Sequence, residues 1–326
     1  MRMDRFCAVA LVTVIALATY VSRGGMPYSG EMPETHGLQL AGASKLMPRV
    51  GFGTCCRKSS KGQPLIDSTL SYLSQGGRLI DTAQMYENHA DLAVAIRRSG
   101  VPRSELWVTS KVRTLRGDGS EFTGSHRTAV TMEVEKILVE LDLTQLDLLL
   151  LHHAKGNTAA ERADEWRGLL DSKAQGQVVN VGVSNYDVPQ LEALRDATGV
   201  LPAVNQLEYH PWIPEHDAIV QWCKSNGVGV IAYGSLGSSN NRASAGAGVA
   251  AVAARHGASS AQVLLRWALQ RGVAVIPGAT SAEHIRQNLH LPPFVLSDHH
   301  PGHHPLRLIT LGSPHRAPII KTQASL

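Results

Sequence analysis

Four polar side chains in the first half of the sequence could together move a proton onto an oxygen atom: Asp81, Tyr86, Lys111 and His152. An unassisted tyrosine has a pKa near 10 and is a poor proton donor at neutral pH. A lysine ammonium beside the phenol lowers this pKa by stabilising the phenolate. An aspartate can hold the lysine there through an ion pair, and His152 can donate a hydrogen bond to the same oxygen or relay the proton. The set predicts a general acid next to a site for a developing oxyanion.

Hydride addition to a carbonyl group needs this combination, because negative charge builds on the carbonyl oxygen as the hydride arrives. No amino-acid side chain supplies a hydride, so a cofactor must supply it. Each residue also has a structural alternative. The Asp81–Lys111 pair could serve only stability, and Tyr86 could pack in a loop. His152, which is next to His153, could be a satisfied core histidine.

Eight short apolar runs divide the sequence, and most of them end in a polar residue. They span residues 49–53, 77–81, 106–111, 146–152, 178–185, 202–206, 227–233 and 272–278. Apolar runs without alternation are typical of strands that are buried on both faces of a parallel sheet. Helical patterns lie between the runs, for example over residues 64–76, 128–142 and 260–272.

Alternating strands and helices predict an α/β fold, and eight units predict a closed (β/α)8 barrel, the TIM barrel, in a single domain. A doubly wound open sheet is the alternative. A dinucleotide site in that fold needs a G-x-G-x-x-G turn after the first strand. The segment "GFGTCC" at 51–56 is not such a turn, so we favour the barrel.

The barrel would gather the candidate residues at one rim, because its working groups sit at the C-terminal ends of the strands. Asp81 ends the second strand and Tyr86 follows it; Lys111 ends the third strand and His152 the fourth. The next three strands also end in polar side chains, which are Ser184 and Asn185, Gln206, and Tyr233. A chance scatter would place many of these groups elsewhere.

On these motifs the sequence resembles the aldo-keto reductases over about residues 45–297. The similar segments are "MPRVGFGT", "IDTAQMYEN", "WVTSK", "LDLLLLHH", "GVSNY", "VNQLEYHP" and "IAYGSLG". The resemblance implies NADPH-dependent reduction of aldehydes and ketones to alcohols. It also implies that Asp81, Tyr86, Lys111 and His152 form the catalytic tetrad, with Tyr86 as the proton donor.

The resemblance further implies a cofactor site. Ser184, Asn185 and Gln206 would hydrogen-bond the nicotinamide amide, and Tyr233 would stack on the ring. By themselves, Ser and Asn after a strand are most often a helix N-cap. The full implied set is Gly53, Thr54, Asp81, Ser184, Asn185, Gln206, Tyr233, Gly234, Leu236, Pro277, Arg286, Gln287 and Asn288.

Three departures from the family concern the substrate pocket. Cys55, Arg113 and His153 stand where the family often has tryptophan. We expect a wider, more polar pocket formed by these residues with Tyr86 and His152. Arg113 raises the hypothesis of an acidic or phosphorylated substrate, and the alternative is that it points to solvent or pairs with a loop carboxylate.

The cofactor end departs as well. Gly278 stands where many members have a lysine that contacts the 2′-phosphate of NADP, and His284 stands where an arginine is common. A 2′-phosphate needs cationic partners, and Arg286 or His284 could serve. We expect NADP(H), with NAD(H) as the alternative.

Composition narrows the remaining possibilities. The 326 residues are 43% hydrophobic and 18% charged, as in ordinary globular proteins. The formal charge of +4 comes without a basic stripe, which argues against nucleic-acid binding. The cysteines show no zinc or disulfide spacing, so we expect Cys55 and Cys56 to be two ordinary thiols, with a vicinal disulfide as the alternative.

The two ends of the chain differ from the expected barrel at residues 37–297. Residues 1–36 carry an uncharged run at 6–21, which is short for a membrane span and suits a cleaved secretory signal. A signal anchor and an organelle presequence are the alternatives. We therefore favour secretory or organellar entry over a cytoplasmic location, and membrane contact only through 6–21 if the segment stays uncleaved.

Residues 298–326 lack helical periodicity, and we expect an irregular, disordered tail. Its four histidines, at 299, 300, 303 and 304, invite a metal site, but the prolines and glycine favour the tail, so we expect no metal. We expect a monomer acting on a small carbonyl substrate. The rival function is a nicotinamide-binding barrel that is catalytically weak or inactive and serves as a redox sensor or regulatory subunit. A hydrolase would need paired carboxylates at strand ends, and only Asp81 qualifies.

Overall fold

The computed structural model describes residues 37–113, 125–154, 157–237 and 246–296. The expected targeting segment at 1–36 and the expected tail at 298–326, with its four histidines, lie outside these residues. Within the described ranges, no helix has both the length and the apolar character needed to cross a membrane.

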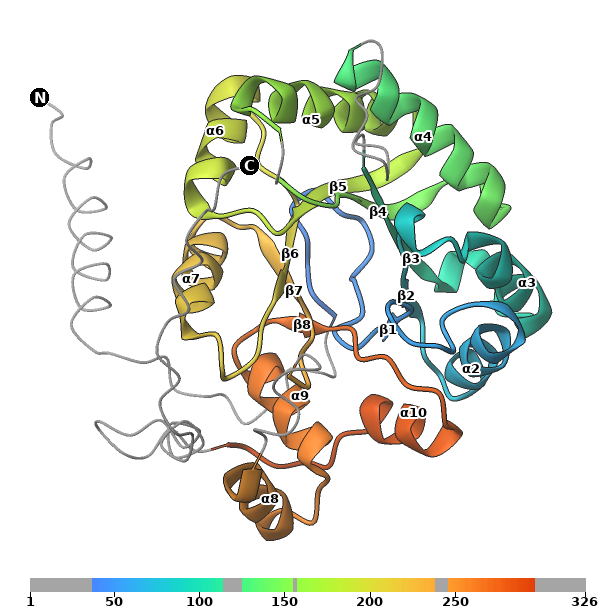
Figure 1. The fold of residues 1–326 in the computed structure, drawn as a ribbon, viewed down its shortest axis with the longest axis vertical. Coiled ribbons are helices and arrows are strands. Elements are labelled where there is room, and N and C mark those ends of the chain that lie inside the picture. Colours follow the sequence, from blue (N-terminus) through green and yellow to red (C-terminus); the bar gives the residue numbers. More distant parts are fainter. Residues whose placement is uncertain (1–36, 114–124, 155–156, 238–245, 297–326) are drawn as a thin grey trace, which may run out of the picture.

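Eight parallel strands follow one another around a curled sheet in chain order (Figure 1). They are β1 (Phe52–Gly53), β2 (Leu79–Asp81), β3 (Trp107–Val112), β4 (Leu146–Leu151), β5 (Val178–Ser184), β6 (Val204–Glu208), β7 (Gly229–Tyr233) and β8 (Ala274–Val275). Six of them lie within predicted apolar runs, whereas β3 and β6 continue one and two residues past the predicted ends at Lys111 and Gln206, to Val112 and Glu208. The sheet returns on itself where Val50 and Val275 form an isolated parallel bridge. The α/β prediction and the TIM-barrel arrangement are confirmed.

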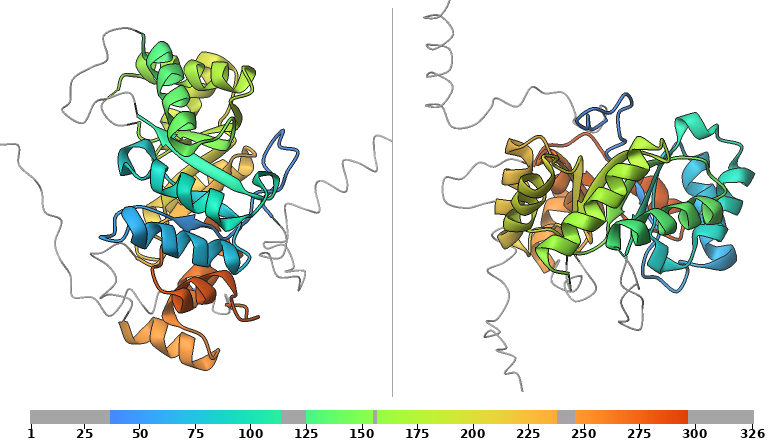
Figure 2. Two further views of the ribbon diagram at one scale, coloured as in Figure 1. Left: turned by 90° about the vertical axis from the view of Figure 1, so that its right-hand side faces the viewer. Right: turned by 90° about the horizontal axis from the view of Figure 1, so that it is seen from above.

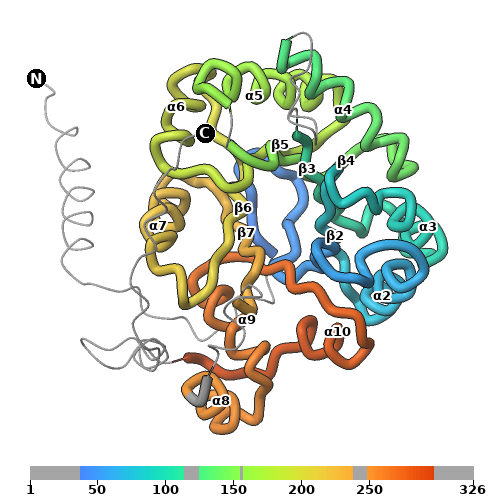
Figure 3. Tube along the Cα trace, viewed as in Figure 1, coloured from blue at the N-terminus to red at the C-terminus, as the bar shows by residue number. Residues whose placement is uncertain are grey.

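Helices surround the sheet, and the tube in Figure 3 shows the chain passing around the ring in sequence order. They are α2 (Gly62–Ser74), α3 (His89–Ser99), α4 (His126–Leu141), α5 (Ala159–Ala174), α6 (Val188–Thr198), α7 (Asp217–Ser225), α8 (Gly246–Arg255), α9 (Ser260–Gln270) and α10 (Ala282–Leu289). Short 3-10 turns are η2 (Gln84–Tyr86), η3 (Arg103–Glu105) and η4 (Pro214–His216). The three helical patterns read from the sequence correspond to α2, α4 and α9.

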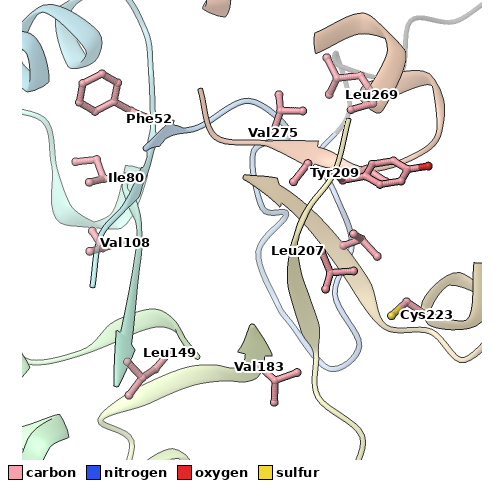
Figure 4. Packing of buried hydrophobic residues seen from close by; sticks show 14 of the residues in the cluster. Phe52, Ile80, Val108, Leu149, Val183, Leu207, Tyr209, Cys223, Leu269 and Val275 are labelled. Carbon is pink, nitrogen blue, oxygen red and sulfur yellow. The ribbon is translucent and has the colours of Figure 1, made fainter. Parts of the chain in front are cut away.

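Both faces of the sheet are buried, which explains the unbroken apolar runs. Leu148 and Leu150 of β4 belong to a cluster inside the barrel, whereas Leu149 and Leu151 belong to the larger cluster beneath the helices. Figure 4 shows residues of the larger cluster arranged around the ring of strands. Because successive strand residues point to opposite faces, one run supplies both cores.

The segment at 37–48 closes one end of the barrel. Leu38 and Met47 pair in an antiparallel bridge, and Leu40 and Met47 are buried in the inner cluster beside Trp107. Both views in Figure 2 show this segment, in blue, standing at one end of the molecule. The C-terminal ends of the strands lie at the opposite end, where polar residues can face a cavity.

Candidate active site

The turn after β2 carries Tyr86 to the strand ends. Asp81 is the last residue of β2, and the 3-10 turn η2 ends at Tyr86. Thr82 Oγ1 donates to Asn88 Oδ1 at 2.6 Å, and Asn88 Nδ2 donates to the Thr54 carbonyl at 3.2 Å. These buried contacts fix the loop against β1. Asn88 was not predicted as a site residue, although a polar residue two positions after Tyr86 was the available signal.

Lys111 connects Asp81 with Tyr86. Its Nζ donates to Asp81 Oδ1 at 2.5 Å, to the Thr82 carbonyl at 2.9 Å and to Tyr86 Oη at 3.5 Å. Lys111 and Asp81 are 1% and 2% exposed, so the ion pair is shielded from water. An ammonium has three donors, and all three are directed at this site.

The pKa of Tyr86 moves in the direction opposite to our expectation. Burial raises the pKa of Tyr86 above its usual value of 10, the Lys111 charge lowers it and the Asp81 charge raises it, and burial dominates. Burial alone would lower the pKa of Lys111, but Asp81 and Tyr86 together raise it. Tyr86 therefore keeps its proton and Lys111 its charge at neutral pH.

His152 lies directly after β4 and beside Tyr86. The two rings meet edge to face with centroids 5.7 Å apart, and the His153 ring stacks on His152 at 4.5 Å. Burial, followed by the charges of Lys111, His153 and Arg113, lowers the pKa of His152 to about 2. The imidazole is thus neutral and carries one N–H donor. Its Nδ1 makes no hydrogen bond to any described residue.

Asn185, after β5, ties several of the expected residues together. Its backbone has a φ of 63°, in the left-handed region that asparagine tolerates better than most residues. Its Nδ2 donates to the His152 carbonyl and to Ser184 Oγ, each at 3.0 Å. Tyr233 Oη donates to Asn185 Oδ1 at 2.7 Å. Residues from the ends of β4, β5 and β7 are therefore held as one unit.

Gln206 joins the expected cofactor residues to the expected catalytic residues. Its Nε2 donates to Asp81 Oδ2 at 2.7 Å, and its backbone carbonyl accepts from Ser184 Oγ at 2.9 Å. Both oxygens of Asp81 are thus engaged, one by Lys111 and one by Gln206. The side-chain oxygen of Gln206 makes no hydrogen bond within the described residues, so it is available to accept one from an amide.

A cavity of about 470 Å³ opens at these strand ends. The predicted residues that line it are Gly53, Cys55, Asp81, Tyr86, His152, His153, Ser184, Asn185, Gln206, Tyr233, Gly234, Leu236 and Pro277. The lining also includes residues that were not predicted as site residues, which are Cys56, Arg57, Met85, Ser235, Gly237, Ile276 and Gly278. Most residues of the first group lie at or near the C-terminal ends of strands, where the barrel fold places working groups. Most of the second group lies in loops beyond the strands.

Other predicted residues do not line the cavity. Thr54 is buried beside it, and its Oγ1 donates to the Asp81 carbonyl at 3.0 Å. Arg286 holds Glu283 on α10 with contacts of 2.9 and 2.7 Å. Residues outside the lining are Thr54, Lys111, Arg113, Arg286, Gln287 and Asn288. Of these, Lys111 still contacts a residue of the lining, because its Nζ lies 3.5 Å from Tyr86 Oη.

Cys55 and Cys56 form a vicinal disulfide, so the expectation of two ordinary thiols is wrong. Cys56 has a φ of 68°, a conformation that turns the chain sharply between the two residues, and their Cα atoms lie 3.7 Å apart. Both residues line the cavity, where the family often has a tryptophan at position 55. Cys223 is a buried free thiol whose pKa is raised to about 11 by burial.

The donor set suits a nicotinamide cofactor. A carboxamide needs both donors and acceptors, and the cavity offers Ser184, Asn185 and the unengaged oxygen of Gln206. Tyr233 adds an aromatic surface beside them. No cluster of three or more metal-ligating side chains occurs among the described residues.

Comparison with known proteins identifies the family. The family model described as "Aldo/keto reductase family" matches residues 66–300 of this chain. The chain is 32% identical over 244 residues to the methylglyoxal reductase DkgB of Escherichia coli O157:H7, with 74% of this chain and 86% of the relative covered. It is 34% identical over 251 residues to the glyoxal reductase of Bacillus subtilis, with 77% and 85% covered.

The fold is similar to that of an aldo-keto reductase from Bombyx mori solved in complex with NADP. The TM-score is 0.71 at 25% identity, and the match covers 84% of this chain and 92% of that one. The resemblance inferred from the motifs is thereby confirmed. By sequence and by fold, this chain belongs to the aldo/keto reductase family of oxidoreductases.

Proposed function

We propose that this protein reduces small aldehydes and ketones to alcohols with NADPH, and that Tyr86 is the proton donor. The observation that carries the proposal is the placement of Lys111 Nζ between Asp81 Oδ1, at 2.5 Å, and Tyr86 Oη, at 3.5 Å. Tyr86 and Asp81 line the cavity together with His152. A phenol and a neutral imidazole thus face the cavity that would receive a carbonyl oxygen, and the ammonium of Lys111 lies behind the phenol, 3.5 Å from its oxygen.

Tyr86 would give its proton to the carbonyl oxygen as charge develops there. The raised pKa keeps the phenol protonated before the reaction, and Lys111 stabilises the phenolate that remains afterwards. Asp81 holds the lysine, and Gln206 holds Asp81 from the other side. His152, neutral because its pKa is lowered to about 2, would donate its N–H to the same oxygen and orient the substrate.

The nicotinamide group, when bound, supplies the hydride. We infer that Ser184, Asn185 and Gln206 would hold its carboxamide, because these residues line the cavity beside Asp81 and Tyr86. Tyr233 would present its ring, with its hydroxyl fixed by Asn185 at 2.7 Å. These side chains are held by one another, so little ordering would be needed on binding.

The substrate would be small and polar. Cys55, Cys56 and His153 line the cavity in place of the aromatic walls that the family often has. Relatives at 32% and 34% identity are a methylglyoxal reductase and a glyoxal reductase. We propose short dicarbonyls of this kind as substrates, because a second oxygen on the substrate can bond to a polar wall.

Oxidation of NADPH by methylglyoxal tests the proposal. We expect turnover by the wild-type protein, and a loss of about 10²- to 10⁴-fold in kcat in Tyr86→Phe, because the general acid is removed. NADPH should bind the variant as it binds the wild type. Binding without turnover of any aldehyde by the wild-type protein would instead support the regulatory alternative.

A further inference from the structure

Gly278, after β8, leaves space that an arginine from another loop occupies. A Cβ atom placed on Gly278 would overlap the Nη1 atom of Arg57 and would lie 2.6 Å from Arg57 Cζ. It would also lie 2.9 Å from the Gly53 carbonyl oxygen. A side chain at position 278 and the guanidinium of Arg57 therefore cannot occupy this place together.

The Arg57 side chain is held in this space by several contacts. Both terminal nitrogens, Nη1 and Nη2, donate to the Gly53 carbonyl at 3.1 Å, and Nη1 also reaches the Cys55 carbonyl at 3.5 Å. The Arg57 Cζ atom lies 5.9 Å from the centre of the Phe52 ring. These contacts to carbonyl oxygens and to an aromatic ring fix the position of the guanidinium at the edge of the cavity.

The loop that carries Arg57 is also fixed. The Arg57 N–H donates to Ser60 Oγ at 3.0 Å, and Asn88 Nδ2 donates to the Ser60 carbonyl at 3.1 Å. Ser59 Oγ lies 3.0 Å from Thr280 Oγ1, which links this loop to the segment after β8. The position of Arg57 beside Gly278 is thus built into the packing of two loops.

Arg57 is the one lysine or arginine among the described residues that line the cavity. It lies beside Gly53 and Gly278, and the same cavity is lined by Tyr86 and His152. A guanidinium presents paired N–H donors that match the oxygens of a phosphate. Arg286, which the sequence suggested for this purpose, is engaged by Glu283 on α10.

We propose that Arg57 binds a phosphate group of the dinucleotide cofactor and that Gly278 is the residue that makes room for it. The inference rests on the proposed NADPH-dependent function. It places the cation that contacts the phosphate in the loop after β1. That cation, Arg57, belongs to none of the motifs that the sequence shares with the family. The phosphate could be the 2′-phosphate of NADPH or the pyrophosphate that NADPH and NADH share, and binding experiments separate the two.

The test is direct binding of NADPH and NADH to the full-length protein, followed by quenching of its tryptophan fluorescence. In Arg57→Met we expect a rise in Kd for NADPH of about 10- to 100-fold, the range for losing a charge-assisted hydrogen bond. The matched control is Lys58→Met, which removes a neighbouring exposed charge outside the cavity lining and should leave Kd unchanged.

Two further variants protect the test against misfolding. Gly278→Ala keeps every charge but displaces the guanidinium, so it should weaken NADPH binding in the same direction. Arg57→Met combined with Gly278→Lys returns a cation to the same space, and it should recover part of the lost affinity. Thermal unfolding of each variant shows whether the fold is intact.

Comparing the Kd values for NADPH and NADH distinguishes the two possible phosphate contacts. Weaker binding of NADPH alone supports a contact with the 2′-phosphate, and equal weakening of NADPH and NADH supports a contact with the pyrophosphate. Unchanged Kd values for both cofactors in folded Arg57→Met and Gly278→Ala would overturn the proposal, as would a defect seen only in KM for a carboxylate-bearing aldehyde. A wild-type protein that binds neither cofactor would overturn the proposed function itself.

Discussion

Gln206 on β6 and Asp81 on β2 are joined by a hydrogen bond of 2.7 Å across the mouth of the barrel. The two residues are 125 positions apart in the sequence. Asp81 accepts from Gln206 through one oxygen and from Lys111 through the other. A residue expected to hold the cofactor thus also fixes the carboxylate that positions the lysine.

Removing Lys111 should destabilise the protein, because Asp81 would be left as a buried charge without its ionic partner. We expect Lys111→Met to lower the free energy of unfolding by about 3–5 kcal/mol, as measured by urea denaturation. Adding Asp81→Asn should recover part of that loss, since the buried charge is then gone. A double variant less stable than Lys111→Met would contradict this account.

The pH dependence of reduction should follow the raised pKa of Tyr86. Because the acid form persists above the usual value of 10, kcat should stay nearly constant between about pH 6 and 9. Stopped-flow measurement of NADPH oxidation across this range checks the expectation. A fall in kcat centred near pH 8, with the circular dichroism spectrum unchanged, would show that Lys111 outweighs burial.

His152 should make the fold sensitive to acid. Its folded-state pKa is lowered to about 2 from 6.5, so the unfolded chain binds a proton below pH 6.5 that the folded chain does not. Stability is therefore lost as pH falls, by about 2 kcal/mol between pH 7.5 and 5 for this group. The free energy of unfolding, measured by urea denaturation at pH 7.5 and at pH 5, should therefore fall by about 2 kcal/mol less in His152→Gln than in the wild type. An equal fall in both proteins would show that His152 is not the source of the acid sensitivity.

The vicinal disulfide should be visible by alkylation. In denatured, unreduced protein we expect iodoacetamide to label Cys223 but not Cys55 or Cys56, and prior reduction should expose both. Peptide mass spectrometry identifies the labelled positions. Cys55→Ser serves as the control, because Cys56 should then be labelled without reduction. Labelling of all three in the unreduced wild type would show two separate thiols.

Arg113 should have little effect on substrate charge, because it is not among the described residues that line the cavity. We expect Arg113→Leu to leave the ratio of kcat/KM for a carboxylate-bearing and a neutral aldehyde unchanged within about twofold. Steady-state kinetics with the two aldehydes check this. A selective loss toward the charged aldehyde would restore the hypothesis of an acidic substrate.

The sequence by itself determined the order of strands and helices and the positions of Asp81, Lys111 and His152. A strand buried on both faces leaves an unbroken apolar run, so its end is visible in the sequence. In a parallel barrel every strand end lies on one rim, and a polar residue at that end is placed without knowledge of its neighbours. The resemblance to the family added the roles expected of Tyr86, Ser184, Asn185, Gln206 and Tyr233.

Tertiary structure decided what depends on distance and burial. The direction of the Tyr86 pKa shift follows from how deeply the phenol is enclosed, which no local pattern encodes. The burial of Leu40 and Met47 at the closed end, and the contact of Gln206 with Asp81, join segments far apart in the chain. The place of Arg57 beside Gly278 depends on two loops that meet only when β8 returns to β1, because a missing side chain becomes usable space only after its neighbours are packed.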